Sequence, residues 1–213
     1  MTSSRERSRL PRLHLITSDQ LLRSSSFGEI AAGLLGVGGD RIALHLRGQS
    51  MSGREMWDLA ANVKKAVERF GSWLFINDRI DVAIACGAHG VQLGEESFQV
   101  REARRIVPAS MLIGVSVHGP YRSEAAVNAG ADFLVAGTIF ESASHPEKSC
   151  AGAALVSGIA AFGAPVIAIG GVTVERVSEV RERGAHGVAV ISGIWNADDP
   201  VGQLERYLKE LED

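Results

Sequence analysis

Short runs of apolar residues, rich in β-branched side chains, recur along the chain and predict buried strands. They lie at residues 13–17, 42–46, 73–76, 90–93, 112–117, 133–136, 165–170 and 187–192. Most of these runs are apolar at every position instead of alternating with polar residues. Such runs are typical of parallel strands that are buried on both faces. The pattern therefore predicts eight parallel strands.

Segments with the helical period separate the predicted strands. Apolar residues recur at helical spacing over residues 52–70, 123–130 and 173–184. An internal repeat, seen in "GAHGVQL", "GADFLVA" and "GAHGVAV", places a glycine three residues ahead of a strand at positions 87, 130 and 184. Glycine readily adopts the left-handed conformation that ends a helix. Helices and strands therefore alternate along the chain.

This alternation predicts an α/β fold, a (β/α)8 TIM barrel in a single domain. We expect the barrel to span residues 12–213 and to follow a flexible N-terminal tail over residues 1–11. An open doubly wound sheet is the alternative. It is less favoured because no G-x-G-x-x-G motif follows the first strand.

Composition narrows the class of protein. With 213 residues, of which 46% are apolar and 22% charged, the chain can bury a core as one domain. The net charge of −3 argues against nucleic-acid binding, and no apolar run approaches the roughly 18 residues that cross a membrane. Cys86 and Cys150 lack the spacing of zinc ligands. The polar, basic N-terminus has no apolar signal-peptide segment, so we expect a cytoplasmic protein.

The barrel prediction separates the histidines into two groups, because residues at the C-terminal ends of the strands face the mouth of a barrel. His89 and His186 precede strands, and His14 lies near the start of one, so we expect structural roles for these three. His45 and His118 lie toward the ends of their strands and are expected at the mouth. His118 closes the run "IGVSVHG"; a core histidine held by a hydrogen bond is the alternative there.

Glycines directly follow the seventh and eighth predicted strands, in "AIGGVT" and "VISGI". Loops at this place can offer backbone N–H groups to a phosphate without an intervening side chain. We therefore predict a phosphate site at Gly170, Gly171, Ser192 and Gly193. Tight turning in a small barrel is the alternative explanation.

Further polar side chains are expected at the mouth. Arg47 follows the second strand and suits a phosphate or carboxylate, unless it is simply a surface arginine. Asn77 and Asp78 end the third strand, where Asp78 could bind a metal or cap the next helix. The polar loop over residues 137–152 is long for a barrel and is a candidate lid. Its His145 and Lys148 could contact an anion or remain solvated.

The segments "LHLIT", "LHLRGQS", "INDRIDVAIACGAHGVQLGEES", "GVSVHG", "ADFLVAGTIF", "PVIAIGGV" and "GAHGVAVISGI" together resemble the thiamine-phosphate synthase/TenI superfamily. The resemblance begins at about residue 12 and covers all eight predicted strands in order. It implies one of two activities. The synthases couple a pyrimidine pyrophosphate to a thiazole phosphate, and TenI is a tautomerase that aromatises a thiazole carboxylate phosphate.

Departures from the synthase motifs favour the TenI branch. The synthase motif Q-x-R-x-K corresponds here to His45, Arg47 and Gln49, and Ser97 stands where H-x-G-Q-x-D has a magnesium-binding aspartate. The motif T-x-T-K is replaced by Ser142, Ala143, Ser144 and His145. Losing a lysine and a metal carboxylate would leave the developing charge of pyrophosphate largely uncompensated. In contrast, "SVHG" resembles the TenI motif whose histidine transfers the proton.

The resemblance thus implies a thiazole tautomerase, an isomerase that needs no metal or redox cofactor. His118 would act as general base and acid in a 1,3-proton shift. The substrate is expected to be a thiazole phosphate bound by Arg47, Asn77, Ser116 and Thr138. Three alternatives stay open: a thiamine-phosphate synthase, a non-catalytic regulator that binds thiazole phosphate, and another isomerase built on a phosphate-binding barrel. No nucleic-acid or membrane partner is expected, and a homo-oligomer is possible.

Overall fold

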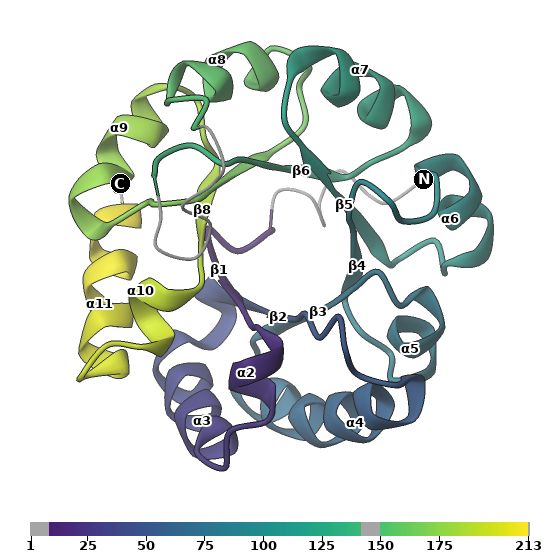
Figure 1. Cartoon of the computed structure of the whole chain (residues 1–213), viewed down its shortest axis with the longest axis vertical. Coiled ribbons are helices and arrows are strands. Elements are labelled where there is room, and N and C mark those ends of the chain that lie inside the picture. Colours follow the sequence, from purple (N-terminus) through teal and green to yellow (C-terminus); the bar gives the residue numbers. More distant parts are fainter. Residues whose placement is uncertain (1–8, 142–149, 213) are drawn as a thin grey trace.

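The computed structural model describes residues 9–141 and 150–212 and forms a closed barrel of eight parallel strands (Figure 1). The strands are β1 (Leu13–Ile16), β2 (Ile42–Leu46), β3 (Trp73–Asn77), β4 (Gly90–Leu93), β5 (Leu112–Val117), β6 (Phe133–Ala136), β7 (Val166–Ile169) and β8 (Gly187–Val190). Each strand pairs with its neighbour in the sequence, and β8 pairs with β1. The predicted (β/α)8 barrel is confirmed.

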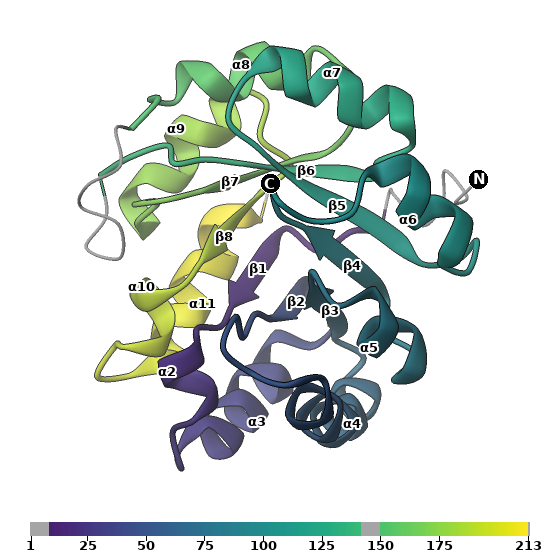
Figure 2. The same cartoon turned by 45° about the vertical axis from the view of Figure 1, so that its right-hand side comes forward.

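The helices form an outer ring around the strands (Figures 1 and 2). They are α2 (Asp19–Leu22), α3 (Phe27–Gly38), α4 (Gly53–Phe70), α5 (Ile80–Ala85), α6 (Val100–Ile106), α7 (Pro120–Ala129), α8 (Ala154–Ala160), α9 (Val177–Glu182), α10 (Ser192–Trp195) and α11 (Pro200–Leu211). Two 3₁₀ turns, η1 (Gly39–Arg41) and η2 (Val174–Arg176), precede β2 and α9. Residues 1–8 of the predicted N-terminal tail lie outside the described residues.

Helix α4 shows how local sequence sets the boundaries of these elements. The Ser52 side chain accepts a hydrogen bond from the Glu55 N–H, and the Glu55 carboxylate accepts one from the Ser52 N–H. This capping box satisfies two N–H groups that would otherwise lack partners at the helix start. Gly71, with a φ of 74°, ends the helix in the left-handed conformation. The buried residues, Met56, Ala60, Val63 and Val67, recur at helical spacing and pack toward the barrel.

Apolar residues pack in two concentric layers. The larger layer lies between the barrel and the helices, and the smaller one fills the barrel interior. Phe75 and Phe133 anchor the interior layer and meet edge to face, with ring centroids 5.3 Å apart. The His14 ring packs against both phenyl rings. The interior is therefore a packed core, and a ligand can enter only at an end of the barrel.

A buried ion pair lies at the N-terminal end of the strands, opposite the mouth. The Asp132 side chain is 3% exposed, pairs with the Arg104 guanidinium and accepts a hydrogen bond from the Ile113 N–H at 2.9 Å. His89 and His186 also lie at this end, and one nitrogen of each ring contacts the backbone. His89 Nδ1 accepts a hydrogen bond from the Leu74 N–H, and His186 Nε2 lies 2.8 Å from the Leu10 carbonyl oxygen. This end of the barrel serves stability.

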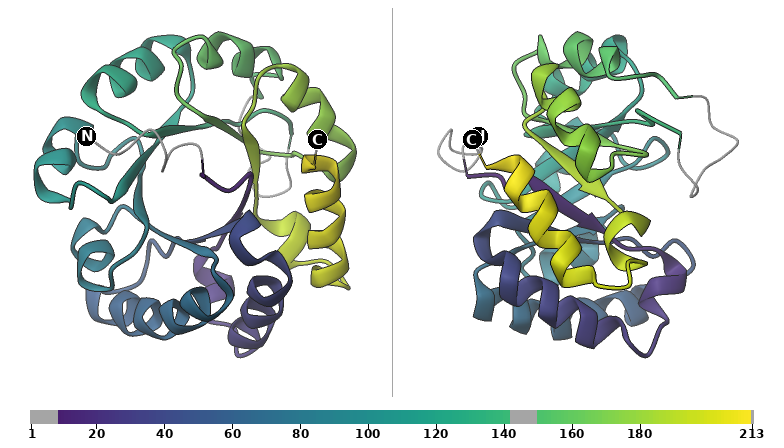
Figure 3. Two further views of the ribbon diagram at one scale, coloured as in Figure 1. Left: turned by 180° about the vertical axis from the view of Figure 1, so that it is seen from behind. Right: turned by 90° about the vertical axis from the view of Figure 1, so that its left-hand side faces the viewer.

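The first and last strands close the barrel against each other. Leu13 pairs with Val188, and the Arg12 guanidinium donates a hydrogen bond to the Leu211 carbonyl oxygen at 2.8 Å. Helix α11 lies beside α3, as Figure 3 shows in both views. In the part of the chain that the structure describes, no helix is long and apolar enough to span a membrane.

Candidate active site

A pocket of about 820 Å³ opens at the C-terminal ends of the strands. Its wall contains the nine residues that the sequence nominated for proton transfer, substrate binding and phosphate binding: Arg47, Asn77, Ser116, His118, Thr138, Gly170, Gly171, Ser192 and Gly193. Residues from β2 to β8 and their following loops therefore converge on one cavity. Its volume falls in the range typical of small-molecule sites.

Two glycines shape one end of this pocket. Gly170 and Gly171 follow β7 with φ angles of 98° and 60°, a region that disfavours other residues. A Cβ atom on Gly171 would clash with the carbonyl oxygen of Glu141. The backbone here approaches the neighbouring loop too closely for a side chain. This geometry fits the predicted phosphate loop, although turning alone also requires glycine at these positions.

Arg176 supplies a positive charge near the same loop. Its guanidinium donates a hydrogen bond to the Gly171 carbonyl oxygen at 3.1 Å and lies 4.5 Å from the centre of the Phe140 ring. Tyr207, from α11, donates its hydroxyl to the Val172 carbonyl oxygen at 2.9 Å, and burial raises the pKa of this phenol to about 12. Both side chains line the pocket, and their hydrogen bonds hold the backbone of the glycine loop.

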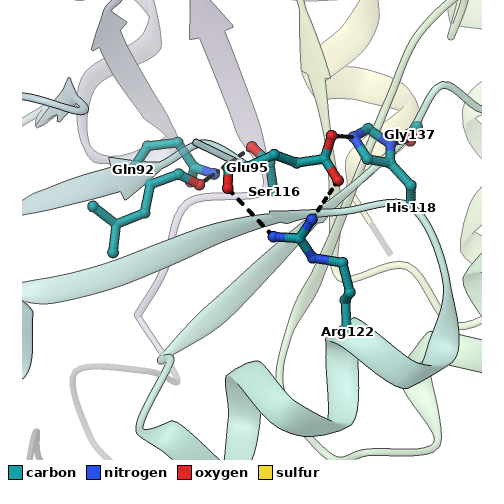
Figure 4. A network of polar contacts seen from close by, with 7 residues as sticks. Gln92, Glu95, Ser116, His118, Arg122 and Gly137 are labelled. Carbon is teal, nitrogen blue, oxygen red and sulfur yellow. Dashed lines mark hydrogen bonds and ion pairs between the residues drawn. The ribbon is translucent and has the colours of Figure 1, made fainter. Parts of the chain in front are cut away.

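The part of the wall that follows β4, β5 and β6 carries a polar network around His118 (Figure 4). His118 Nδ1 hydrogen-bonds the Gly137 carbonyl oxygen, and since a carbonyl only accepts, Nδ1 carries the proton. Nε2 lies 3.6 Å from a Glu95 carboxylate oxygen, and Arg122 pairs with the same carboxylate at 2.6 Å. The His118 side chain is 45% exposed. His118 is therefore held at the rim with Nε2 directed toward Glu95, and it is not a core histidine.

Beside this network, the Gln92 amide donates to the Ser116 hydroxyl at 3.0 Å. Ser116 and Gln92 point into the barrel from adjacent strands, because Gln92 is paired with Gly114 and the glycine leaves room for the amide. Figure 4 shows the pair next to Glu95 and His118. The Ser116 hydroxyl is thereby oriented at the pocket wall.

Asp78 lies at the end of β3 with a φ of 63°, which is unusual for a residue other than glycine. Its Oδ1 atom accepts hydrogen bonds from the Gly94 N–H, at 2.8 Å, and from the Ser97 hydroxyl. The alternative that Asp78 caps the next helix is wrong, since Arg79 occupies the N-cap position of α5, and its side chain makes no capping hydrogen bond. Asp78 instead ties the loop after β4 to the end of β3.

These residues do not fit a magnesium site with two carboxylates. Ser97 stands at the position of the second carboxylate in the synthase motif, and its hydroxyl donates to the first. The described ranges, 9–141 and 150–212, contain no group of three or more His, Cys, Asp or Glu side chains that could hold a metal ion. No reaction step is therefore assigned to a metal.

The prediction that His45 faces the mouth is wrong. His45 is fully buried inside the barrel, where its Nε2 lies 2.8 Å from Nδ1 of His14 and its ring stacks on Phe75 at 4.8 Å. It is absent from the pocket wall. His45 lies one residue before the end of β2, and the next inward-facing residue, Arg47, occupies the mouth in its place.

The sequence interpretation missed Glu95 and Arg176 in the pocket wall, and it missed Arg122, which pairs with Glu95. Glu95 lies within the segment that was compared with H-x-G-Q-x-D, where it replaces a glutamine. Its carboxylate was a signal that could have been used. Arg122 and Arg176 lie in helical segments with no motif. Residues 142–149 of the proposed lid, with His145 and Lys148, lie outside the described residues.

Comparison with known proteins gives a consistent result. The family model described as thiamine monophosphate synthase matches residues 13–194. A thiamine-phosphate synthase from Methanoculleus marisnigri is 36% identical over 189 residues, 88% of this chain and 89% of the relative. Another, from Pyrococcus horikoshii, is 34% identical over 203 residues and 95% of both chains.

Solved structures agree. Thiamine phosphate pyrophosphorylase from Pyrococcus furiosus has a TM-score of 0.83 and 31% identity, with 96% of each chain covered. A 3-hexulose-6-phosphate synthase has a TM-score of 0.72 at 17% identity and shares the fold alone.

These names overturn the expected isomerase activity. The relatives are named as synthases, which are transferases, and none of the names above supports the TenI branch. The similarity over most of the chain outweighs the departures from the synthase motifs at positions 45, 49 and 97.

Proposed function

The chain belongs to the thiamine monophosphate synthase family, and from this premise we propose that it is a thiamine-phosphate synthase. It would join a pyrimidine pyrophosphate to a thiazole phosphate. The bond between the pyrimidine methylene carbon and the pyrophosphate oxygen breaks, and a bond from the thiazole nitrogen to that carbon forms. Pyrophosphate leaves with the electron pair of the broken bond.

The observation that carries the proposal is that two separate parts of one pocket wall carry groups that suit an anion. Gly170, Gly171 and Arg176 lie in one part, after β7, and Arg47 lies after β2. Two substrates that each carry a phosphate or pyrophosphate need two such parts in one cavity. A volume of about 820 Å³ accommodates both rings side by side.

In this proposal, different side chains of the pocket bind the two substrates. Arg47 would bind the pyrophosphate as a bidentate donor and offset charge as it leaves. The glycine loop would hold the thiazole phosphate and fix the distance between the thiazole nitrogen and the methylene carbon. His118, whose proton is held on Nδ1 by Gly137, would offer Nε2 to substrate from the rim.

A second candidate function is a protein that binds these ligands without coupling them. One observation favours this function. The Ser97 hydroxyl donates a hydrogen bond to Asp78 Oδ1, at the place where the synthase motif has a pair of carboxylates. Such a protein would retain the pocket and the phosphate loop but would compensate the charge of pyrophosphate poorly.

Two measurements on the same preparation separate the candidates. The protein is incubated with both substrates and magnesium, and thiamine phosphate and pyrophosphate are quantified together; calorimetry measures the affinity for thiamine phosphate. Stoichiometric formation of both products supports the synthase. Tight binding with no turnover supports the binding protein. The absence of both binding and turnover rejects both candidates. Arg47→Met should weaken pyrophosphate-dependent steps, whereas Arg105→Met, on the exposed face of α6, serves as the matched control.

A further inference from the structure

A second cavity, of about 310 Å³, opens at the N-terminal end of the barrel, opposite the candidate active site. It lies where the turns that follow α5 and α6 meet the first residues of β3 and β5. None of the residues that line it also lines the first pocket. Most of its wall is apolar and consists of Trp73, Ile84, Ala88, Pro108, Met111 and Leu112.

Two stacked rings form part of this wall. The centroids of the Trp73 and His89 rings are 5.1 Å apart, and their planes differ by 27°. Trp73 also stacks on Phe75 of the barrel interior, with ring centroids 6.4 Å apart, which fixes the orientation of the indole. An aromatic side chain held in this way offers a flat apolar surface on which another flat ring can stack.

His89 adds one hydrogen-bond donor to the apolar wall. Its Nδ1 accepts a hydrogen bond from the Leu74 N–H at 3.0 Å, so the proton of the neutral ring is on Nε2. Burial lowers the pKa of His89 to about 4, which keeps the ring neutral at physiological pH. Within residues 9–141 and 150–212, Nε2 has no hydrogen-bond partner. The Nε2–H group at the outer end of the ring is therefore available to a ligand.

We propose that this cavity is a second binding site, and that it takes a planar heteroaromatic compound of one or two fused rings whose unprotonated ring nitrogen accepts a hydrogen bond from His89. An apolar cavity of about 150 Å³ can bind benzene, so 310 Å³ has room for two fused rings. None of the described residues that line the cavity is charged at neutral pH, which disfavours a charged ligand. The site is independent of the proposed synthase function.

Benzimidazole and indole are matched probes for this site. The two compounds have nearly the same size and shape, and each carries one N–H group. Only benzimidazole has an unprotonated ring nitrogen, so only benzimidazole can accept a hydrogen bond from His89. Calorimetry at pH 7.5 should show about threefold to tenfold tighter binding of benzimidazole. In long-range ¹H–¹⁵N correlation spectra, benzimidazole should shift the Nε2 resonance of His89 more than indole does.

A pair of variants locates the bound probe. Ile84 lines the cavity and is 37% exposed, so Ile84→Glu places a carboxylate at its rim without opening the core. This variant should bind benzimidazole about tenfold more weakly or worse. Ile106→Glu is the matched control, because Ile106 is 54% exposed on α6 and lies outside the cavity wall. Its affinity for benzimidazole should equal that of the unmodified protein, and circular dichroism checks the fold of both variants.

Three results would overturn this proposal. They are equal affinities for the two probes, an Nε2 resonance of His89 that benzimidazole leaves in place, and binding of benzimidazole that survives Ile84→Glu. The last result would place the probe elsewhere, as in the larger pocket. A failure to bind either probe at millimolar concentration also rejects the site. None of these outcomes bears on the formation of thiamine phosphate, so this proposal and the synthase function can fail separately.

Discussion

Ser97→Asp is the most informative single change at this site. In the native protein, the Ser97 hydroxyl donates to Asp78, whose Oδ1 atom also accepts from the Gly94 N–H. The substitution removes a donor and places a second carboxylate beside the first. It also restores the residue type of the synthase motif. We therefore expect a protein that is less stable without magnesium and more responsive to it.

The magnitude follows from two contributions. A hydrogen bond to a charged group contributes about 1.5–3 kcal/mol, and this bond is lost. Two carboxylates about 4 Å apart repel by about 4 kcal/mol at the effective dielectric of a protein surface, and solvent and partial protonation reduce this repulsion. A net loss of about 3 kcal/mol in unfolding free energy is expected. For a domain of this size, the loss corresponds to a fall in Tm of roughly 6–12 °C.

Calorimetric melting with a chelator and then with millimolar magnesium provides the assay. Magnesium should restore most of the lost Tm in Ser97→Asp and change the Tm of the native protein little. Ser97→Ala, which removes the hydrogen bond and adds no charge, is the control and should show a smaller fall with no response to magnesium. If Ser97→Asp melts like the native protein and ignores magnesium, the two side chains do not share a site, and the reasoning is refuted.

Three further changes test the rest of the molecule. Gly171→Ala should weaken phosphate binding in calorimetry and lower the Tm, because its φ is 60° and a Cβ atom would clash with loop backbone. Gly28→Ala, in open space within α3, should leave phosphate binding unchanged and should not lower the Tm. Arg104→Met removes the cation from a buried carboxylate and should cost about 3–5 kcal/mol in urea unfolding, whereas Arg105→Met, on the exposed surface, should cost little. Acid should destabilise the protein below about pH 6.5, because the pKa of His45 is 6.5 in the unfolded chain and about 3 in the fold, so the unfolded state binds more protons between these values. The contribution of His45 to this loss of unfolding free energy should reach about 3 kcal/mol at pH 4. In His45→Gln, the unfolding free energy measured with urea should therefore change less with pH over that range. An unchanged pH dependence would contradict the burial of a neutral ring.

The strands were predicted closely because local sequence determines them. The runs at 90–93, 112–117 and 133–136 coincide with β4, β5 and β6, since each is bounded by a turn and apolar throughout. Helix α7 was placed less well. It begins at Pro120, where the fixed φ of proline suits the first helical position, and not at residue 123 as the apolar pattern suggested.

Much of the site was also predictable, because the C-terminal ends of parallel strands must meet at one end of a barrel. How deep each inward-facing residue lies within the barrel was not predictable from the sequence. Whether His45 or Arg47 reaches the mouth depends on how the strands are staggered, and this stagger comes from pairing between distant segments. The contact of Glu95 with Arg122 also joins two connecting segments that no local pattern relates.

The pairing of β1 with β8 has a consequence for how the protein is made. The two strands that close the ring are the first and the last in the sequence. Leu13 pairs with Val188, so the edges of β1 and β8 stay unpaired until both strands are present. During synthesis, the unpaired edge of β1 stays open to association with other chains until β8 emerges from the ribosome. The pocket draws on both sides of this seam, so no partly synthesised chain contains a complete binding site. A bound phosphate ligand would join the two sides and slow their separation, which makes ligand occupancy a determinant of resistance to proteolysis.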